Sequence, residues 1–224
     1  MHQTTRYHYS PETIIKAYSL GLFPMADSHD SRDIRFYDPD QRALIPLDAT
    51  TGNGLHIPRR LVRRVRQQPY EISINRDFAG VIGGCAEQTI SRKDTWINAD
   101  IKTLYIALHK MGFAHSIEVW DAGVLVGGLY GVALRAAFFG ESMFSRKTDA
   151  SKIALVHLMA RLCHGRFQLL DAQFTNDHLR QFNVTEVPRD IFQQRLHAAL
   201  ASEADLLQQT SSEDLTRQFL AKIS

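Results

Sequence analysis

An aspartate and a glutamine stand two residues apart in the apolar segment Leu170-Asp171-Ala172-Gln173-Phe174. In a strand, alternate side chains share one face, so Asp171 and Gln173 are predicted to point the same way. An acid beside an amide can position an amine, and the acid can also accept the proton of that amine. The alternative is a polar face on an edge strand, and the periodicity alone favours this alternative.

A second carboxylate, Glu141, follows Gly140 at the end of an apolar segment that the pattern predicts to be a strand. A glutamate flanked by glycine and apolar residues either forms a structural ion pair or belongs to a functional site. The residues alone leave these two alternatives open.

Five arginines fall within eight residues and predict a basic helix face. On a helix, three of them form one stripe and the other two lie beside it, while Leu61, Val62 and Val65 face the core. No acidic residue within four positions neutralises this stripe. A solvated face is the usual interpretation, but the lack of neutralisation favours binding to phosphates. The five are Arg59, Arg60, Arg63, Arg64 and Arg66.

Trp96 lies in a polar segment just before a predicted helix, where a tryptophan can stack on a base or anchor the loop. Cys85 and Cys163 lack CxxC spacing and have apolar neighbours, which favours buried thiols over a disulfide or a metal site. The histidines also lack the spacing of metal ligands, so we expect no metal. The sequence has no phosphate-binding glycine loop, nucleotide-binding glycine fingerprint or serine-hydrolase motif.

The composition is that of a globular protein with its own core. The chain has 224 residues, of which 44% are hydrophobic, and this suits one domain or one domain with a small lobe. A net charge of +2 does not by itself demand a nucleic-acid partner. No apolar run reaches the length of a membrane span and the N-terminus lacks a signal sequence, so we expect a cytoplasmic protein that does not contact a membrane.

The order of predicted elements is a helix, a meander of three antiparallel strands, a helix and a further strand, which is an α+β pattern. It is similar to the order in the acyltransferase fold called GNAT. A small lobe of turns and short strands is predicted before a boundary near residues 51–54, so residues 1–54 form a small N-terminal domain and residues 55–224 the catalytic domain. The predicted helices are 11–20, one from residue 58, 100–111, 150–163, 176–182 and two C-terminal ones; the strands are 115–120, 124–134, 136–144 and 167–174.

Many short runs, in an unchanged order from about Ser10 to Pro188, closely resemble the bacterial leucyl/phenylalanyl-tRNA-protein transferases. Three long runs carry most of the likeness, and shorter runs stand on both sides of them. The long runs are residues 115–120, 127–132 and 138–146; the shorter ones are 17–18, 21–24, Pro39-Asp40 with Arg42, 84–86, 95–97, 150–152, 170–173 and 176–178.

The resemblance implies a small N-terminal domain on a GNAT-like C-terminal domain with an antiparallel or mixed sheet. It also implies transfer of leucine, phenylalanine and, less readily, methionine from charged tRNA to proteins that begin with arginine or lysine. This addition marks the acceptor for degradation by the N-end rule. The family needs no metal, acyl-CoA or other cofactor, and we expect a monomer.

The resemblance also assigns roles by position. Asp171 and Gln173 act in catalysis, and Glu141 is our candidate for attracting the basic N-terminus of the acceptor. The five arginines fall where the family contacts the tRNA backbone. The pocket for the donor side chain includes Leu129, Phe138, Leu155 and Leu170; Tyr37 and Trp96 lie near the terminal adenosine; Glu141 and Asn176 line the site.

The chain departs from the family pattern at three positions. The family usually has tryptophan at Tyr37, methionine at Leu129 and asparagine at Asp149. Weaker stacking at Tyr37 and a slightly different pocket shape at Leu129 are therefore expected.

Three alternatives remain to be separated. A GNAT enzyme that uses acyl-CoA usually has a glycine-containing pyrophosphate loop, and residues 145–151 contain no glycine. A non-catalytic RNA-binding module would explain the arginines but not the pair Asp171 and Gln173. A transferase that moves amino acids from tRNA to a cell-wall precursor shares the fold class. Whether Asp171 is a general base or only positions the amine also stays open.

Overall fold

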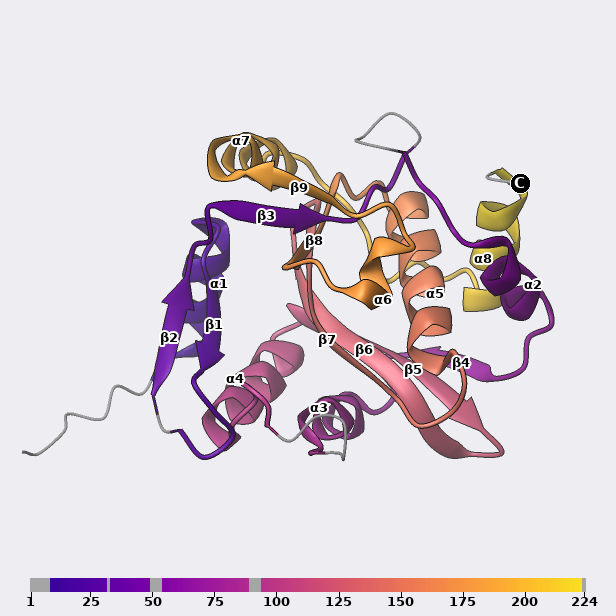
Figure 1. Cartoon of the computed structure of the whole chain (residues 1–224), viewed down its shortest axis with the longest axis horizontal. Coiled ribbons are helices and arrows are strands. Elements are labelled where there is room, and N and C mark those ends of the chain that lie inside the picture. Colours follow the sequence, from indigo (N-terminus) through magenta and orange to yellow (C-terminus); the bar gives the residue numbers. More distant parts are fainter. Residues whose placement is uncertain (1–8, 32, 49–53, 89–93, 223–224) are drawn as a thin grey trace, which may run out of the picture.

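The computed structural model describes residues 9–31, 33–48, 54–88 and 94–222, and it has two sheets. A small antiparallel sheet pairs β1 (Phe23–Ala26) with β2 (Ile34–Tyr37). A mixed sheet has the strand order β4-β5-β6-β7-β8-β3-β9, and the predicted α+β class is confirmed (Figure 1). Its strands are β3 (Gln41–Leu44), β4 (Glu71–Ile74), β5 (Ala114–Asp121), β6 (Val124–Leu134), β7 (Ala137–Ser145), β8 (Leu169–Gln173) and β9 (Thr185–Pro188).

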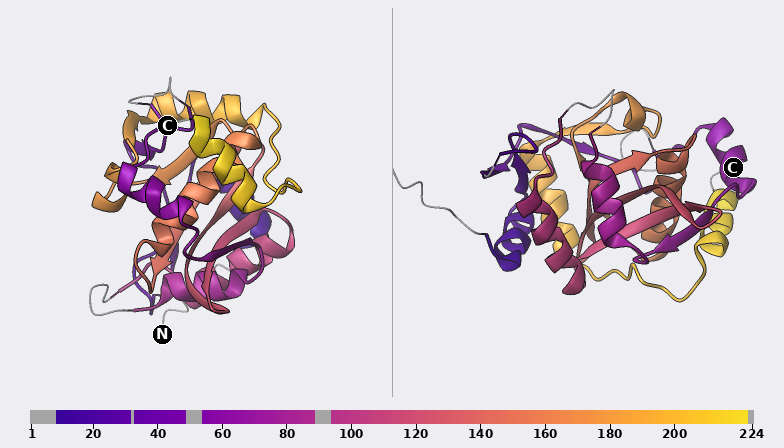
Figure 2. Two further views of the ribbon diagram at one scale, coloured as in Figure 1. Left: turned by 90° about the vertical axis from the view of Figure 1, so that its right-hand side faces the viewer. Right: turned by 90° about the horizontal axis from the view of Figure 1, so that it is seen from below.

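Helices cover both faces of the mixed sheet, as Figures 1 and 2 show. One face packs against α5, with α2 and α8 beside it, and we call this the α5 side. The other face packs against α3 and α4, with α1 beside α4, and we call this the α4 side. The helices are α1 (Pro11–Ser19), α2 (Arg59–Arg66), α3 (Phe78–Ala86), α4 (Ala99–Lys110), α5 (Ala150–His164), α6 (Asp177–Arg180), α7 (Arg189–Leu200) and α8 (Ser212–Lys222).

Each face of the sheet has its own apolar core, because neighbouring residues of a strand point to opposite faces. On β6, Leu129 belongs to the core of the α5 side and Tyr130 to that of the α4 side. On β7, Phe138 and Phe139 divide in the same way. The sheet is therefore the middle of three layers, and side chains from one strand reach two different environments.

Strands β7 and β8 run parallel but stay paired over a short distance only. Their register joins Ala137 to Leu169, Phe138 to Leu170 and Phe139 to Asp171, while β7 continues to Ser145 without β8. On its other side β8 pairs with β3. Strand β8 is thus an interior strand, and the alternative that places Asp171 on the polar face of an edge strand is wrong.

Several local predictions are confirmed. The Ser10 side chain accepts the N–H of Thr13 at the start of α1, with proline at the first helical position. Ala122 and Gly123 have φ values of 49° and 78°, the left-handed geometry of a tight hairpin turn between β5 and β6. The cap of α4 differs from the prediction, since Asn98 rather than Asp100 accepts the N–H of Ile101.

Strands β4 and β9 and helix α3 are not among the predicted elements, because they are short or rich in glycine and give little periodicity. Strand β3, from the stretch predicted to be a small lobe, lies inside the mixed sheet between β8 and β9. Residues 51–53 of the predicted boundary lie outside the described residues, as do residues 89–93 of the polar segment before Trp96. The division at residue 54 stays a prediction.

Candidate active site

A cavity of about 760 Å³ opens where β7 and β8 diverge. Leu129 and Tyr130 both line it, although they point to opposite faces of the sheet, and so do Leu170 and Asp171. Such neighbours can share one cavity only where the sheet itself is open. The α5 side thus contributes apolar groups and the α4 side contributes polar ones.

The cavity brings together most of the predicted catalytic and substrate-binding side chains, from six separate parts of the chain. The loop before α4, strands β6, β7 and β8, helix α5 and the cap of α6 each contribute. The predicted residues that line the cavity are Trp96, Leu129, Glu141, Leu155, Leu170, Asp171 and Asn176.

Three predicted residues do not line this cavity. Phe138 is buried in the core of the α5 side, where its ring packs edge-on against Phe167. Tyr37 stacks on Phe23 with ring centroids 6.1 Å apart. Gln173 is buried directly beside Asp171, with its amide Nε2 3.4 Å from Asp171 Oδ2. The same-face prediction for Asp171 and Gln173 thus matches the geometry.

Asp171 is completely buried, and it forms an ion pair with Arg42. Arg42 Nη2 donates to Asp171 Oδ2 at 2.7 Å, and Arg42 Nε donates to Oδ1 at 2.9 Å and to Oδ2 at 3.1 Å. The backbone N–H of Gln173 also donates to Oδ1, at 2.8 Å. A buried carboxylate without such partners would be strongly unfavourable, so this arrangement explains how the acid is tolerated there.

Arg42 is itself enclosed, with 1% of its side chain exposed. Its guanidinium lies between the rings of Phe23 and Phe192, 4.5 and 4.4 Å from their centroids. The remaining nitrogen Nη1 donates to the carbonyl of Gly21 at 2.9 Å. Gly21 has a φ of +82°, in the left-handed region that favours glycine, and this conformation brings its carbonyl to the guanidinium.

Glu141, on β7, faces the same cavity but has phenols for partners instead of a cation. Tyr18 donates to its Oε1 at 2.5 Å and Tyr105 donates to its Oε2 at 2.9 Å, and the two hydroxyls also contact each other. Burial raises the pKa of the Glu141 carboxyl to about 7, against the two phenol hydrogen bonds that lower this pKa, and the nearby charge of Asp171 raises it further. Glu141 therefore exchanges its proton near neutral pH.

Tyr130 adds a third phenol next to this group, with its ring 5.3 Å from that of Tyr105. Within the described part of the chain, its hydroxyl is buried without a hydrogen-bond partner. Leaving a buried hydroxyl unpaired costs about 1–3 kcal/mol. A polar ligand in the cavity could recover this loss by bonding to the Tyr130 hydroxyl.

The five arginines form α2, away from the cavity and on the α5 side. Leu61 and Val65 face the core as predicted, and Arg59, Arg60 and Arg63 are exposed. Figures 1 and 2 both show α2 next to α8, at the end of the molecule where the chain terminates. A ligand that contacts both α2 and the cavity must therefore be large enough to extend from one to the other.

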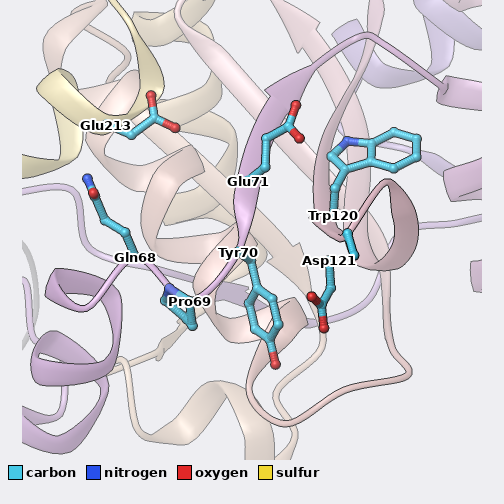
Figure 3. Close-up of a pocket in the computed structure, with 8 residues that line it drawn as sticks. Gln68, Pro69, Tyr70, Glu71, Trp120, Asp121 and Glu213 are labelled. Atoms are coloured by element: carbon cyan, nitrogen blue, oxygen red, sulfur yellow. The ribbon is translucent and has the colours of Figure 1, made fainter.

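A second, more open cavity of about 380 Å³ lies below α8 and carries three carboxylates (Figure 3). Arg76 binds Glu71 at 2.6 Å, and Lys147 forms an ion pair with Asp121. The indole N–H of Trp120 donates to Ser73 Oγ at 2.8 Å, so this ring is also engaged within the protein. Two of the three carboxylates, Glu71 and Asp121, thus have partners within the protein, and the larger cavity is the better candidate for a site.

None of the described helices is both long and apolar enough to cross a bilayer. Within the same residues, no cluster of three or more His, Cys, Asp or Glu side chains could bind a metal ion.

Sequence reasoning missed Arg42 and the three tyrosines as parts of the site. Arg42 carried a usable signal, because an arginine directly before Ala43-Leu44-Ile45 enters an apolar strand and a buried arginine requires an anionic partner. The tyrosines gave no such signal, since a buried phenol is ordinary in a protein core.

Comparison with known proteins gives one consistent result. The profile described as "Leucyl/phenylalanyl-tRNA protein transferase" matches residues 50–197, and the profile of the N-terminal domain of the same family matches residues 8–40.

Individual relatives carry the same description. The protein of Hyphomonas neptunium is 55% identical over 197 residues, which cover 88% of this chain and 74% of that protein. The protein of Ruegeria pomeroyi is 51% identical over 195 residues, covering 87% of this chain and 89% of that protein. The protein of Phenylobacterium zucineum is 52% identical over 192 residues, covering 86% and 85%. All three are described as leucyl/phenylalanyl-tRNA–protein transferases.

Proposed function

Because the chain belongs to the leucyl/phenylalanyl-tRNA protein transferase family and is an aminoacyltransferase, we propose that it transfers leucine, phenylalanine and, less readily, methionine from charged tRNA to acceptor proteins. The acceptors begin with arginine or lysine, and the added residue marks them for degradation. The enzyme works in the cytoplasm as a monomer with a GNAT-like catalytic domain and without a cofactor.

The observation that carries this proposal is the two-sided cavity. Its apolar wall, with Leu129, Leu155 and Leu170, suits the side chain of a leucyl or phenylalanyl donor. Its polar wall, with Glu141 and the hydroxyl of Tyr130, suits the amine of an acceptor. An enzyme that joins an apolar acyl group to an amine needs both environments next to each other, and the diverging strands supply them.

The reaction needs alignment more than covalent assistance. The donor is an ester between the amino acid and a hydroxyl of the terminal ribose, and the neutral acceptor amine attacks its carbonyl carbon. The new C–N bond forms, the C–O bond to the ribose breaks, and the ribose oxygen gains the proton that the amine loses. A free α-amine has a pKa of about 7.7–8.0, so a useful fraction is neutral near pH 7. Alignment alone can contribute up to about 7–11 kcal/mol.

The acceptor requirement follows from the charges on the polar wall. The ionised form of Glu141 attracts the basic side chain of an N-terminal arginine or lysine, and the tyrosine rings around it can contact a cation as well. The hydroxyl of Tyr130 provides a further polar contact. Asn176 accepts the N–H of Leu179 with its side chain and so holds the cap of α6 at the cavity wall.

The donor tRNA is recognised at two places. Trp96 lines the cavity, which supports its contact with the terminal adenosine. Tyr37, the second ring of this proposed contact, stacks on Phe23 of the small sheet. The arginines of α2 bind phosphates farther along the tRNA. The shorter ring of Tyr37, where the family usually has tryptophan, gives weaker stacking.

A transfer assay tests the proposal directly. Leucyl-tRNA carrying labelled leucine is incubated with two proteins that differ only in their first residue, arginine in one and glutamate in the other. We expect label only on the protein that begins with arginine. Binding of tRNA without transfer to either protein would favour a non-catalytic RNA-binding module. In a parallel reaction that contains a cell-wall precursor in place of the proteins, label on the precursor would favour that class of transferase.

A further inference from the structure

The backbone at Gln173 has an unusual conformation that Asp171 helps to hold. Gln173 has a φ of +56°, in the left-handed region that costs about 1–2 kcal/mol for a residue other than glycine. Its backbone N–H donates to Asp171 Oδ1 at 2.8 Å, and its side-chain amide lies 3.4 Å from Asp171 Oδ2. Both ends of Gln173 are therefore fixed by one carboxylate.

The same carboxylate has no acceptor position left for a substrate proton. An ionised carboxylate offers about four lone-pair positions. Asp171 accepts five hydrogen bonds, three from Arg42 and two from Gln173. A proton placed on either oxygen would displace one of these donors inside a fully buried group.

Arg42 is held as firmly as Asp171, by contacts from residues 21–23 and from α7. The rings of Phe23, on β1, and Phe192, on α7, cover the two faces of the guanidinium, and the carbonyl of Gly21 accepts from its third nitrogen. This enclosure fixes the orientation of the planar guanidinium, which in turn fixes the plane of the carboxylate.

We infer that Arg42 is a positioning residue for the transfer reaction. It holds Asp171 as an ionised acceptor with every lone pair engaged, so that Asp171 fixes the turn at Gln173 beside the cavity and does not remove the proton of the attacking amine. The inference rests on the proposed transfer reaction, and it gives Asp171 a structural role at the cavity wall. The proton leaves on the ribose oxygen.

The first experiment needs no transfer reaction. In the intact protein, the hydrogen exchange of the Gln173 backbone N–H, which donates to Asp171 Oδ1, is followed by NMR in the wild type, in Arg42→Lys and in Arg76→Lys. Because Arg42 fixes the carboxylate that holds this N–H, we expect faster exchange in Arg42→Lys than in the other two proteins. Equal exchange in all three folded proteins would overturn the inference, whether or not the protein transfers amino acids.

The second experiment is the single-turnover rate of leucine transfer against pH. Arg42→Lys keeps the charge but loses the planar fork, so the rate should fall roughly 10²-fold through misplacement, with charged-tRNA affinity and the shape of the pH profile unchanged. Asp171→Asn should also keep the shape of the profile. Arg76→Lys, which alters an exposed arginine paired with Glu71, is the matched control and should retain the wild-type rate.

Two results would contradict the inference. One is a folded Arg42→Lys protein with the wild-type rate, and the other is an Asp171→Asn protein whose pH profile loses its rising limb. If Arg42→Lys does not fold, Phe192→Leu keeps both charges and removes one ring from the guanidinium. It should lower the rate in the same way by a smaller factor, and an unchanged rate would overturn the inference. A wild-type protein without transfer would defeat the proposed function instead, and the NMR result would still stand.

Discussion

The apolar and polar walls of the cavity are built from residues that are neighbours in the sequence but have opposite requirements. On the α5 side, Leu129 and Leu170 need only shape, because an apolar pocket gains its selectivity from the area that it buries. On the α4 side, the next residues, Tyr130 and Asp171, are buried polar groups that need partners. The apolar wall therefore depends on packing alone, whereas the polar wall depends on a network of hydrogen bonds and ion pairs.

The polar wall itself contains two different kinds of carboxylate. Asp171 is neutralised by Arg42, and Glu141 is paired with Tyr18 and Tyr105. The cation gives Asp171 a permanent partner, whereas burial among phenols raises the pKa of Glu141 to about 7. The two acids of this site therefore have different roles. Asp171 is a fixed element of structure, and Glu141 is a group whose charge responds to pH.

The largest expected effect comes from breaking the ion pair of the polar wall. Arg42→Met leaves the buried carboxylate of Asp171 without its cation, so the free energy of unfolding should fall by about 3–5 kcal/mol and transfer should be lost. In the double variant with Asp171→Leu, no charge remains and stability should return while transfer does not. Denaturant unfolding measures the first quantity, and a double variant that is no more stable than Arg42→Met would contradict this account.

A smaller effect is expected from the second carboxylate, and it depends on pH. The folded protein keeps the proton of Glu141 up to about pH 7, while the unfolded chain loses it near its ordinary pKa of 4.5. As pH rises through that window, the contribution of Glu141 to the free energy of unfolding therefore falls, by up to roughly 3 kcal/mol in total.

Glu141→Gln should remove this contribution, so the variant should gain stability relative to the wild type between pH 4.5 and about pH 7. Melting temperatures across the window measure the gain. Glu186→Gln, which changes an exposed carboxylate, should run parallel to the wild type. A Glu141→Gln curve of melting temperature against pH that is also parallel to the wild type would mean that Glu141 has the pKa of an ordinary exposed acid.

On the apolar wall, the effect of a substitution should depend on the donor. Leu155→Phe fills part of the pocket, so phenylalanine transfer should fall more than leucine transfer, by about 1–3 kcal/mol for each methylene of misfit. The ratio of the two single-turnover rates in one variant cancels any loss of folded protein. An equal loss for both donors would mean that Leu155 is part of the core and does not touch the substrate.

The smallest effect per substituted residue is expected for α2, which lies outside both walls of the cavity. Arg60, Arg63 and Arg64 to Ala should weaken tRNA binding and reduce the slope of log affinity against log salt by roughly 0.7–0.9 for each lost phosphate contact. Rates at saturating charged tRNA should not change, because α2 does not line the cavity. A salt slope equal to that of the wild type would remove α2 from the tRNA interface.

The predictable part of the site follows from the two-residue period of strands. Because side chains alternate, the sequence alone placed Asp171 beside Gln173 and opposite Leu170. Helical spacing likewise oriented α2, with Leu61 and Val65 inward. The hairpin and the cap at Ser10 were predictable for the same reason, since each depends on residues a few positions apart. The cap of α4 was misplaced by two residues because Asn98 and Asp100 are both good capping residues.

The tertiary structure alone decided which strands are neighbours and what the buried charges meet. Arg42 and Asp171 are 129 positions apart in the chain, and no periodicity links residues at such a separation. The early divergence of β7 and β8, which opens the cavity to both faces of the sheet, depends on how β3 pairs with β8 on its other side. Local patterns determine which way a side chain points, but the partner of a buried charge is fixed only when distant segments pack, because burial is what makes that partner necessary.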